Sequence, residues 1–280
     1  MSLPPPDVPA LLRQHHLRPS KGLGQNFLID EPALAKVIRT AELTPQDVVL
    51  EIGAGLGSLT RWLAQSARWV VTVEVDPRLI ELLRSILSPF SNVTLLQADI
   101  LEVDPAKIIP DSDYLVVANI PYYITSAVFR HLLESNRPPR RIVLTVQREV
   151  ASRICALPGE MSLLALSVQV YGQPMIAESI PAGAFYPPPK VDSAIVRVDL
   201  YPSPRIPTED LGIFFQLIRA GFGQKRKTLR NALRIGYANS KINVEGLLTT
   251  AGIDPMRRAE TLSLEEWGVL VAAYRLATGN

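Results

Sequence analysis

The chain has few of the residue types that build metal centres, disulfides or membrane spans. Its 280 residues include one cysteine, Cys155, and three histidines, His15, His16 and His131. A single cysteine cannot form an internal disulfide, and these histidines lack the spacing of a metal site. The first residues contain no apolar secretion signal, and no apolar run approaches the roughly 18 residues of a membrane helix. We therefore expect a cytoplasmic protein with no metal and no membrane partner.

An excess of charge of one sign is also missing from the chain as a whole. The formal net charge is +2, which is too small to indicate a nucleic-acid partner. The charge is unevenly distributed, because residues 201–280 carry 11 Lys and Arg against 7 Asp and Glu, an excess of four positive charges. With 47% hydrophobic and 20% charged residues, the chain is expected to form one large and one small domain.

Apolar runs that alternate with helix-like segments indicate the fold. Runs rich in Val, Ile and Leu occur at residues 48–53, 69–75, 93–99, 114–120 and 141–147. Such near-continuous runs, separated by helices, are typical of a parallel sheet that is covered on both faces. The pattern predicts an α/β fold with a doubly wound, mostly parallel sheet. Residues 191–200 alternate apolar and polar side chains, so we expect one more strand there, antiparallel and at the edge.

The order of these segments predicts three parts of the chain. Residues 1–20 form an N-terminal extension, and residues 21–200 form the α/β domain. A proline-rich linker begins at Tyr201, and four segments with helical spacing and no clear strand follow it. Residues 201–280 are therefore expected to be a small all-helical domain.

Glycines at positions 53, 55 and 57 lie between the first strand and its helix, where ligands bind in open α/β sheets. A dinucleotide-binding loop has the spacing G-x-G-x-x-G, but Ser58 stands where the third glycine would be, so NAD fits imperfectly. Glu74 ends the second strand about 20 residues downstream, where an acid can accept bonds from both ribose hydroxyls. Asp99 closes the third strand and can accept a bond from an adenine amine. These positions predict an adenosine site.

The Asn119-Ile-Pro-Tyr122 turn follows the fourth strand, so its side chains should project over the same edge of the sheet. An adenine amine is a poor nucleophile, because its lone pair is delocalised into the ring. Acceptors at the Asn119 side chain and at the Ile120 or Pro121 carbonyl would localise that pair and stabilise the charge that develops on nitrogen. Tyr122 offers a face on which an extruded base can stack. Alternatively, Asn119 caps the next helix, and the tyrosines belong to the core.

With these motifs, the chain resembles the small-subunit ribosomal RNA adenine dimethyltransferase family. The family's hallmark segments occur here as LGQNFLID, EIGAGLG and NIPYYI, and the resemblance continues through VQREVASRI, FYPPPKVDSAIV and FGQKRKTLRNAL, over about residues 18–270. It implies a Rossmann-like class I methyltransferase that uses S-adenosyl-L-methionine. It also implies an enzyme that acts on small-subunit rRNA or the assembling small ribosomal subunit. The sequence leaves the oligomeric state open, and a monomer is the default expectation.

The resemblance also assigns site residues. It implies a cofactor site formed by Asn26, Leu28, Gly53, Gly55, Glu74, Asp99 and Asn119. The reaction would take place at Asn119, Pro121 and Tyr122, with Phe185 as a second aromatic ring that sandwiches the target base. Alternatively, Phe185 is a buried aromatic residue that anchors the following proline loop.

Two groups of basic residues are candidates for RNA contacts. Lys225, Arg226, Lys227 and Arg230 concentrate positive charge near the start of a helix in the small domain. Phosphate contacts from this group would position a structured RNA without reading its sequence. Arg137, Arg140 and Arg141 form a second group. Either group could instead be a solvated face, because runs of charge often are.

Three other functions stay open on the sequence alone. One is a large-subunit rRNA adenine methyltransferase of the macrolide-resistance type, which shares the Asn-Pro-Tyr turn. Another is a non-catalytic RNA-binding or transcription-accessory relative, against which the intact acidic and Asn-Pro-Tyr residues argue. An NAD oxidoreductase is disfavoured by the missing third glycine and by the absence of a histidine suited to proton transfer.

Overall fold

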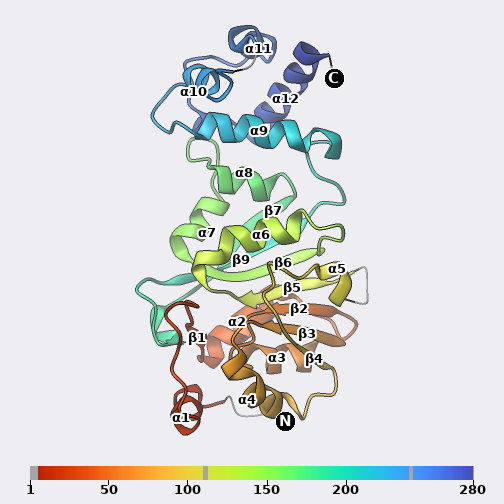
Figure 1. Cartoon of the computed structure of the whole chain (residues 1–280), viewed down its shortest axis with the longest axis vertical. Helices are drawn as coiled ribbons and strands as arrows, with labels where there is room; N and C mark the ends of the chain where they lie inside the picture. Colours follow the sequence, from red (N-terminus) through yellow and green to blue (C-terminus); the bar gives the residue numbers. More distant parts are fainter. Residues whose placement is uncertain (1–5, 110–112, 240–241, 280) are drawn as a thin grey trace. The chain divides into compact units, whose positions relative to one another are not determined.

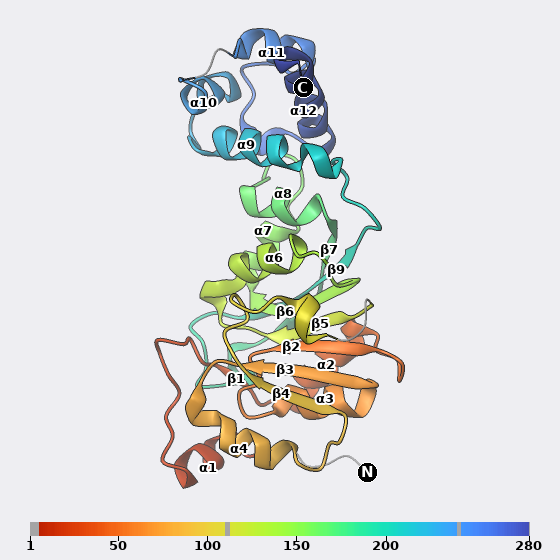
Figure 2. The ribbon, with the colours of Figure 1, turned by 45° about the vertical axis from the view of Figure 1, so that its right-hand side comes forward.

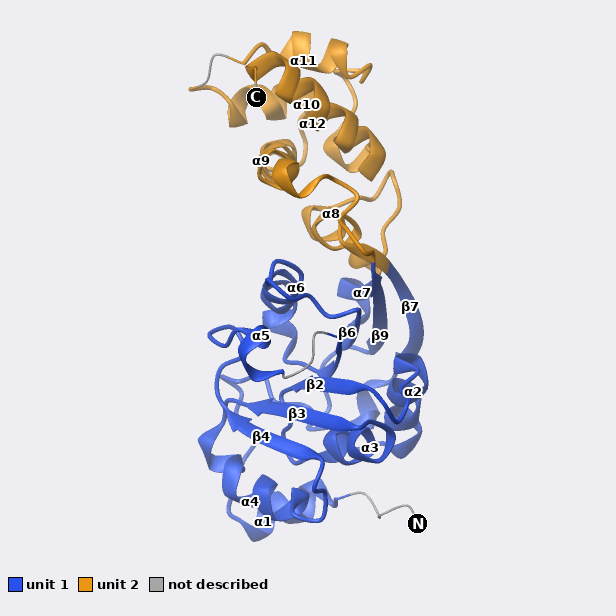
Figure 3. Cartoon of the chain, turned by 90° about the vertical axis from the view of Figure 1, so that its right-hand side faces the viewer, with its two compact units in different colours: residues 1–151, 174–200 blue, residues 152–173, 201–280 orange. Residues whose placement is uncertain are grey.

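The protein is described by a computed structural model that covers residues 6–109, 113–239 and 242–279 (Figure 1). The chain forms two compact units (Figure 3). Unit 1 comprises residues 1–151 and 174–200, and unit 2 comprises residues 152–173 and 201–280. Within the described residues, no helix has the length and apolar character needed to cross a membrane.

Unit 1 is built on a seven-stranded sheet in the order β4-β3-β2-β5-β6-β9-β7 (Figure 2). The strands are β2 (Val48–Ile52), β3 (Trp69–Glu74), β4 (Val93–Gln97), β5 (Leu115–Asn119), β6 (Arg141–Gln147), β7 (Gly172–Ile180) and β9 (Ser193–Leu200). Strands β2 to β6 pair in parallel, and β9 is antiparallel to β6. The doubly wound, mostly parallel sheet is therefore confirmed. The strand order reverses between β2 and β5, which leaves a crevice at their carboxyl ends.

Helices cover both faces of this sheet. They are α2 (Glu31–Ala41), α3 (Ser58–Ser66), α4 (Pro77–Leu87), α5 (Pro105–Ile108) and α6 (Thr125–Leu133), and a further helix, α7 (Arg148–Ile154), directly follows β6. Alternate strand residues such as Val49, Val117 and Val143 pack in one core with α2 and α3. Their neighbours Leu50 and Val116 are equally buried and, by the alternation of side chains along a strand, face the other side. Figure 3 shows α2 and α3 on one side of the sheet and α5 and α6 on the other.

One expectation about the sheet is wrong. Residues 191–200 do form an antiparallel strand, β9, but it lies between β6 and β7 and not at the edge. The edge position belongs to β7, which the sequence pattern did not predict. Met175 and Ile176 of β7 are exposed, so the segment lacks the buried apolar run of the inner strands. Pro174 has no backbone N–H to donate to a neighbouring strand, which is typical of an edge strand.

The N-terminal part of unit 1 is packed onto the α/β domain. Helix α1 (Val8–Gln14) buries Val8 and Leu12 in a cluster with Phe27, Leu56 and Leu79. The short strand β1 (Phe27–Leu28) pairs antiparallel with β8 (Phe185–Tyr186). The chain between α1 and β1 is consequently held at both ends.

Unit 2 contains the helices α8 (Leu163–Gln169), α9 (Leu211–Phe222), α10 (Leu229–Gly236), α11 (Val244–Thr250) and α12 (Leu264–Thr278). They share a core around the fully buried Trp267 and Phe214. The helical character of residues 201–280 is as predicted, and unit 2 resumes at Tyr201, but unit 2 also includes an earlier segment that the sequence placed in the α/β domain. Residues 152–173 belong to unit 2, because Leu166, within α8, and Val170, directly after it, are part of this helical core.

Candidate active site

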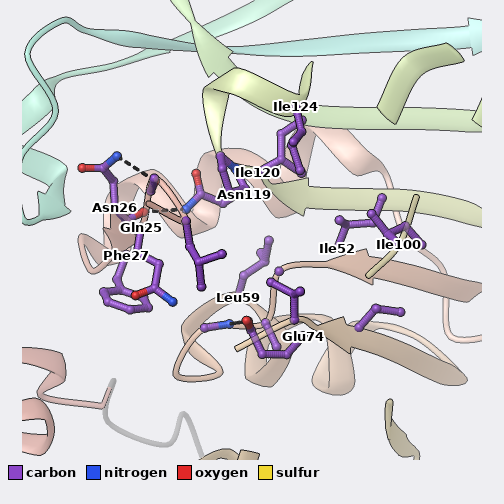
Figure 4. Close-up of a pocket in the computed structure, with 18 of the residues that line it drawn as sticks. Gln25, Asn26, Phe27, Ile52, Leu59, Glu74, Ile100, Asn119, Ile120 and Ile124 are labelled. Atoms are coloured by element: carbon purple, nitrogen blue, oxygen red, sulfur yellow. Dashed lines mark hydrogen bonds between the residues drawn. The ribbon is translucent and has the colours of Figure 1, made fainter. Parts of the chain in front are cut away.

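A cavity opens at the carboxyl ends of the parallel strands of unit 1 (Figure 4). Its lining comes from five parts of the chain, namely residues 23–28, 52–56 with 58–59, 73–75, 98–100 and 119–124. Four of these parts follow or end β2, β3, β4 and β5, and the fifth leads into β1. The crevice that the strand order creates is thus lined by the glycine loop, by the strand ends that carry Glu74 and Asp99, by the Asn119–Tyr122 turn and by the LGQNFL segment.

The glycine loop after β2 approaches its neighbours closely. Gly55 has a φ of +58°, which favours glycine, and a Cβ atom at this position would lie 2.8 Å from Cδ1 of Phe27. The Gly55 N–H donates a 2.7 Å hydrogen bond to Oε2 of Glu74. The loop is therefore held between the Phe27 ring and β3, and no side chain fits at its centre.

Glu74 is the buried acid of the cavity, with only 4% of its surface exposed. Its two oxygens accept hydrogen bonds from the backbone N–H groups of Gly55 and Asp76, at 2.7 and 2.8 Å. Burial raises the pKa of Glu74 above its usual value, although these backbone bonds oppose the shift. A carboxylate oxygen can accept two hydrogen bonds, so Glu74 retains acceptor capacity for hydroxyl groups in the cavity.

Asp76, just beyond β3, connects the cavity to the residues before β1. It accepts a 2.9 Å bond from Nε2 of Gln25 and forms a 2.6 Å ion pair with Arg78, which lowers its pKa. It also caps α4, as its position before Pro77 predicted. Gln25 was not identified from the sequence as a site residue. Its place beside Asn26 in the LGQNFL segment was the available signal.

Asn119 ends β5 and is oriented by a residue far away in the sequence. Its Nδ2 donates a 3.0 Å hydrogen bond to the backbone carbonyl of Asn26, and Figure 4 shows these two residues side by side. The bond fixes the plane of the amide and leaves Oδ1 as an acceptor. The Pro121 carbonyl accepts a 3.2 Å bond from the N–H of Ile124 and keeps a second lone pair. The turn therefore offers the two kinds of acceptor expected of it.

Tyr122 lines the cavity from a short 3₁₀ helix, η1 (Tyr122–Ile124). Its hydroxyl and that of Ser193, on β9, form a 2.6 Å hydrogen bond. Ser193 is fully buried, and burial raises the pKa of Tyr122, so the phenol is neutral and fixed in place. Tyr123 also lines the cavity and is 65% exposed, so it is not the core residue that the capping interpretation of this turn required.

Asp99 lies two residues beyond β4 and is exposed. Its Oδ1 accepts a 2.9 Å bond from the N–H of Leu101, which leaves Oδ2 as an acceptor at the cavity. Ile100, buried beside it, and Ile52 add apolar walls. Leu28 also lines the cavity. The seven residues predicted to bind the cofactor therefore line one cavity.

Phe185 is placed differently from the expectation that it stacks on the target base. It is 2% exposed and packs in the core of unit 1 with Leu28, Leu34 and Ile180, and it is not part of the cavity lining. Its pairing with Leu28 in the β1–β8 ladder explains this burial. In this structure, Phe185 is the buried aromatic anchor of the proline loop, which was the alternative interpretation.

The basic residues considered for RNA contacts differ in their surroundings. Lys225, Arg226 and Lys227 are exposed in the turn between α9 and α10, and Arg230 lies half-buried in the first turn of α10. The second candidate group is not a free cationic patch. Arg140 pairs with Asp47 and Asp113, Arg141 pairs with Glu42 and Asp199, and Arg137 donates to the carbonyls of Ala106 and Ile109. The side chains of these three arginines are therefore already paired with acidic or carbonyl groups of unit 1.

Glu51, in the middle of β2, had no role assigned from the sequence, although it begins the glycine-rich segment. The side chain is 1% exposed, and its Oε2 accepts 2.6 Å bonds from the hydroxyls of Thr60 and Thr72. These bonds connect β2 to α3 and β3 beneath the glycine loop. Burial raises the pKa of Glu51 to about 7, and the nearby Glu74 carboxylate adds to this shift.

Glu51 should make the stability of the fold depend on pH. Because its folded pKa of about 7 lies above the ordinary 4.5, the folded state holds the proton more tightly. Its stabilising contribution is complete below pH 4.5 and is lost as the pH rises through 7. We expect the free energy of unfolding of the wild type to fall by about 3 kcal/mol relative to Glu51→Gln over this window. Urea titrations of both proteins between pH 4.5 and 8 would measure this, and parallel pH profiles would contradict it.

The described residues contain no group of three or more His, Cys, Asp or Glu side chains that could hold a metal ion. A mostly parallel sheet with a glycine loop and a buried acid at its strand-order reversal places the protein among the class I methyltransferases. Comparisons with known proteins define the family within this class.

The model of the ribosomal RNA adenine dimethylase family matches residues 17–273. The chain is 47% identical to ribosomal RNA small subunit methyltransferase A of Dehalococcoides mccartyi over 265 residues, which cover 94% of this chain and 91% of the relative. It is 41% identical to the protein of the same name from Bacillus pumilus over 270 residues, covering 93% and 92% of the two chains. The protein belongs to the ribosomal RNA adenine dimethylase family, and its methyl donor is S-adenosyl-L-methionine.

Solved structures agree with this assignment. A dimethyladenosine transferase from Plasmodium falciparum aligns with a TM-score of 0.73 and 25% identity, over 90% of this chain and 98% of that chain. The 23S rRNA methyltransferase ErmE aligns with a TM-score of 0.71 and 31% identity, over 89% and 99%. The NAD oxidoreductase considered from the glycine spacing is therefore excluded, as these relatives and the family are methyltransferases.

Proposed function

We propose that the protein dimethylates the N6 amine of adenosine in small-subunit rRNA, on free RNA or on the assembling subunit, in the cytoplasm. The observation that carries the proposal is the anchored Asn119 amide, which lines the same cavity as Glu74 and the glycine loop and keeps its oxygen as an acceptor. The small-subunit substrate rests on the relatives that are 39–47% identical over nearly the whole chain and are named for that subunit. We expect the protein to act as a monomer.

The cavity fits the adenosyl group of the methyl donor. Glu74 has acceptor capacity for the ribose hydroxyls, and Asp99 has a free oxygen for the adenine amine. Gly53 and Gly55 have left-handed backbone conformations and line the cavity, so the donor could approach the backbone of the loop without meeting a side chain there. Asn26, just before β1, and Leu28, within β1, would close the cavity from one side. When bound, the donor supplies an activated methyl group on its sulfonium.

The residues of the Asn-Pro-Tyr turn would prepare the target amine. Oδ1 of Asn119 would accept one amine proton, and the Ile120 or Pro121 carbonyl would accept the other. Both acceptors raise electron density on the nitrogen and stabilise the positive charge that develops there. The excess proton can then leave to water, so no histidine or other general base is needed. Positioning by this turn would supply most of the rate.

Tyr122 would hold the base by stacking, and Ser193 would hold Tyr122. We expect Ser193→Ala to lower kcat/KM for RNA roughly fivefold, because it removes one neutral hydrogen bond worth about 1 kcal/mol. In a Tyr122→Phe background, the same change should add almost nothing, because the partner hydroxyl is already absent. Steady-state kinetics of the four proteins would measure this coupling. Full additivity of the two changes would contradict it.

Basic residues of unit 2 would bind the RNA through phosphate contacts. We expect the triple change of Lys225, Arg226 and Lys227 to Ala to raise the Kd for rRNA about tenfold and to leave the Kd for the methyl donor unchanged. Arg230, half-buried beside them, would contribute from the first turn of α10. Binding titrations with each ligand would separate the two effects. An equal loss of affinity for both ligands would contradict this division of labour.

A large-subunit substrate is the second candidate function, favoured by the structural similarity to ErmE. The decisive test incubates the protein with isotope-labelled donor and ribosomal subunits that lack adenine dimethylation, followed by nucleoside mass spectrometry of each rRNA. Label in N6,N6-dimethyladenosine of small-subunit RNA is expected. Label confined to large-subunit RNA would favour the second candidate, and donor binding without transfer would favour a non-catalytic relative.

A further inference from the structure

A second cavity, of about 880 Å³, lies in unit 1 beside the candidate active site. The two cavities share residues 24–26 of their lining, so the segment that anchors Asn119 forms a wall of both. The rest of the second lining comes from the end of α1, the chain leading to β1, and the Tyr186-Pro187 pair. The cavity therefore continues from the place where the target base would be held.

Positive charge is concentrated in this second cavity. Arg13, Arg18 and Lys21 line it together with His16, all four are exposed, and none of the described residues in the lining is acidic. No ion pair joins these three cations to a described acidic residue, in contrast to Arg140 and its partners. Three uncompensated cations at one site attract a polyanion.

The chain around this cavity is held rigidly. Val8 and Leu12 fix α1 in a buried cluster, and the N–H of Leu17 donates a 2.8 Å bond to the Leu12 carbonyl. That turn holds His16 at a φ of +53°, a strained value for a residue other than glycine. A cavity whose backbone is ordered in advance loses less entropy when a ligand binds.

Hydrogen bonds also fix the wall of the second cavity that adjoins the candidate active site. The Ser20 N–H donates a 2.7 Å bond to Oε1 of Gln25, while Nε2 of Gln25 donates to Asp76. Asp76 in turn donates its backbone N–H to Glu74. The basic segment and the donor-binding acid are therefore connected through three successive hydrogen bonds.

We propose that the second cavity binds the sugar-phosphate backbone of the substrate RNA next to the target adenosine. The inference rests on the proposed function. Arg13, Arg18 and Lys21 would contact the phosphates, and the half-buried Tyr186 would offer a flat face to the neighbouring nucleotide. If the RNA backbone is fixed at this point, the extruded base is held in the first cavity. The N-terminal extension is then part of the substrate site.

The test compares the Arg18→Gln/Lys21→Gln double variant with an Arg84→Gln/Lys107→Gln control. The control residues are also exposed in unit 1 and lie outside both cavities. Their replacement removes the same two positive charges as the first variant. The KM for undermethylated small subunits should rise roughly tenfold only in the first variant, with an unchanged donor Kd. The salt dependence of kcat/KM should also weaken, by about 0.7 in log–log slope for each lost phosphate contact.

A photo-reactive amino acid in place of Arg13 gives an independent readout of position. Crosslinks to the nucleotides adjacent to the methylated adenosine are expected, and crosslinks only to distant rRNA segments would overturn the proposal. Wild-type KM and salt slope in the double variant would also overturn it, as would an equal effect in the control. If the proposed function itself fails, the wild type will not methylate small-subunit RNA at all, so the two failures are distinguishable.

Discussion

Replacing Asn119 with alanine should lower kcat for methyl transfer by about 10²- to 10³-fold, which is the usual effect of removing one group that stabilises developing charge. Oδ1 of this amide is the side-chain acceptor at the cavity, and its orientation depends on the 3.0 Å bond from Nδ2 to the Asn26 carbonyl. Single-turnover rates with labelled donor would measure the chemical step directly. The donor Kd should change much less than kcat.

Asn119→Asp is the matched comparison for this prediction. It keeps acceptor oxygens at the same position, but a carboxylate cannot donate to the Asn26 carbonyl. Its kcat should therefore lie between those of the wild type and Asn119→Ala. A kcat near the wild-type value for Asn119→Ala would remove this residue from the reaction.

Gly55→Ala should cost the protein most of its affinity for the methyl donor, with a Kd raised at least about tenfold. The added Cβ atom would lie 2.8 Å from the Phe27 ring. The alanine backbone would also have to adopt a φ of +58°, which L residues rarely do. A shift of this loop would also displace the N–H that donates to Glu74. The left-handed conformation alone costs roughly 1–2 kcal/mol, and the contact adds to it. Isothermal titration calorimetry and thermal unfolding would measure both effects.

Gly252→Ala separates the two causes. Gly252 has a φ of +65°, but a Cβ atom there meets nothing within 4 Å. This control should lose about the same stability from backbone strain and none of the affinity for the donor. If both variants bind the donor equally well, the close approach of the loop has no functional role.

The inner strands of the sheet could be predicted from the sequence because they are buried on both faces. Strands β2, β5 and β6 are continuous Val-, Ile- and Leu-rich runs, and a parallel sheet between helix layers requires such runs. Strand β7 could not be predicted in this way. Its exposed Met175 and Ile176 are stabilised by pairing with β9 on one side only, which is a property of the assembled sheet.

The residues of the candidate site were likewise predictable where a local motif carries them, and not where their surroundings depend on distant parts of the chain. Residues carried by local motifs, such as Glu74 and Asn119, were predicted to lie at the strand ends and do line one cavity. The burial of Phe185 depends on its pairing with β1, more than 150 residues earlier, which composition does not reveal. The partners of Arg140 and Arg141 are also distant in sequence, so a group of basic residues resembled a binding surface until its acids were located.

The division of the chain into interleaved segments affects how it is made. During synthesis, α8 leaves the ribosome before the strands β7 and β9 that complete the sheet, and the helices that cover it follow only after residue 210. Leu166 and Val170 must then remain uncovered while unit 1 is still being completed. A nascent chain that stops at residue 200 would present this apolar helix to solvent, and such surfaces promote aggregation. An isolated catalytic unit would therefore need residues 152–173 replaced by a short polar connection, and not merely a stop codon.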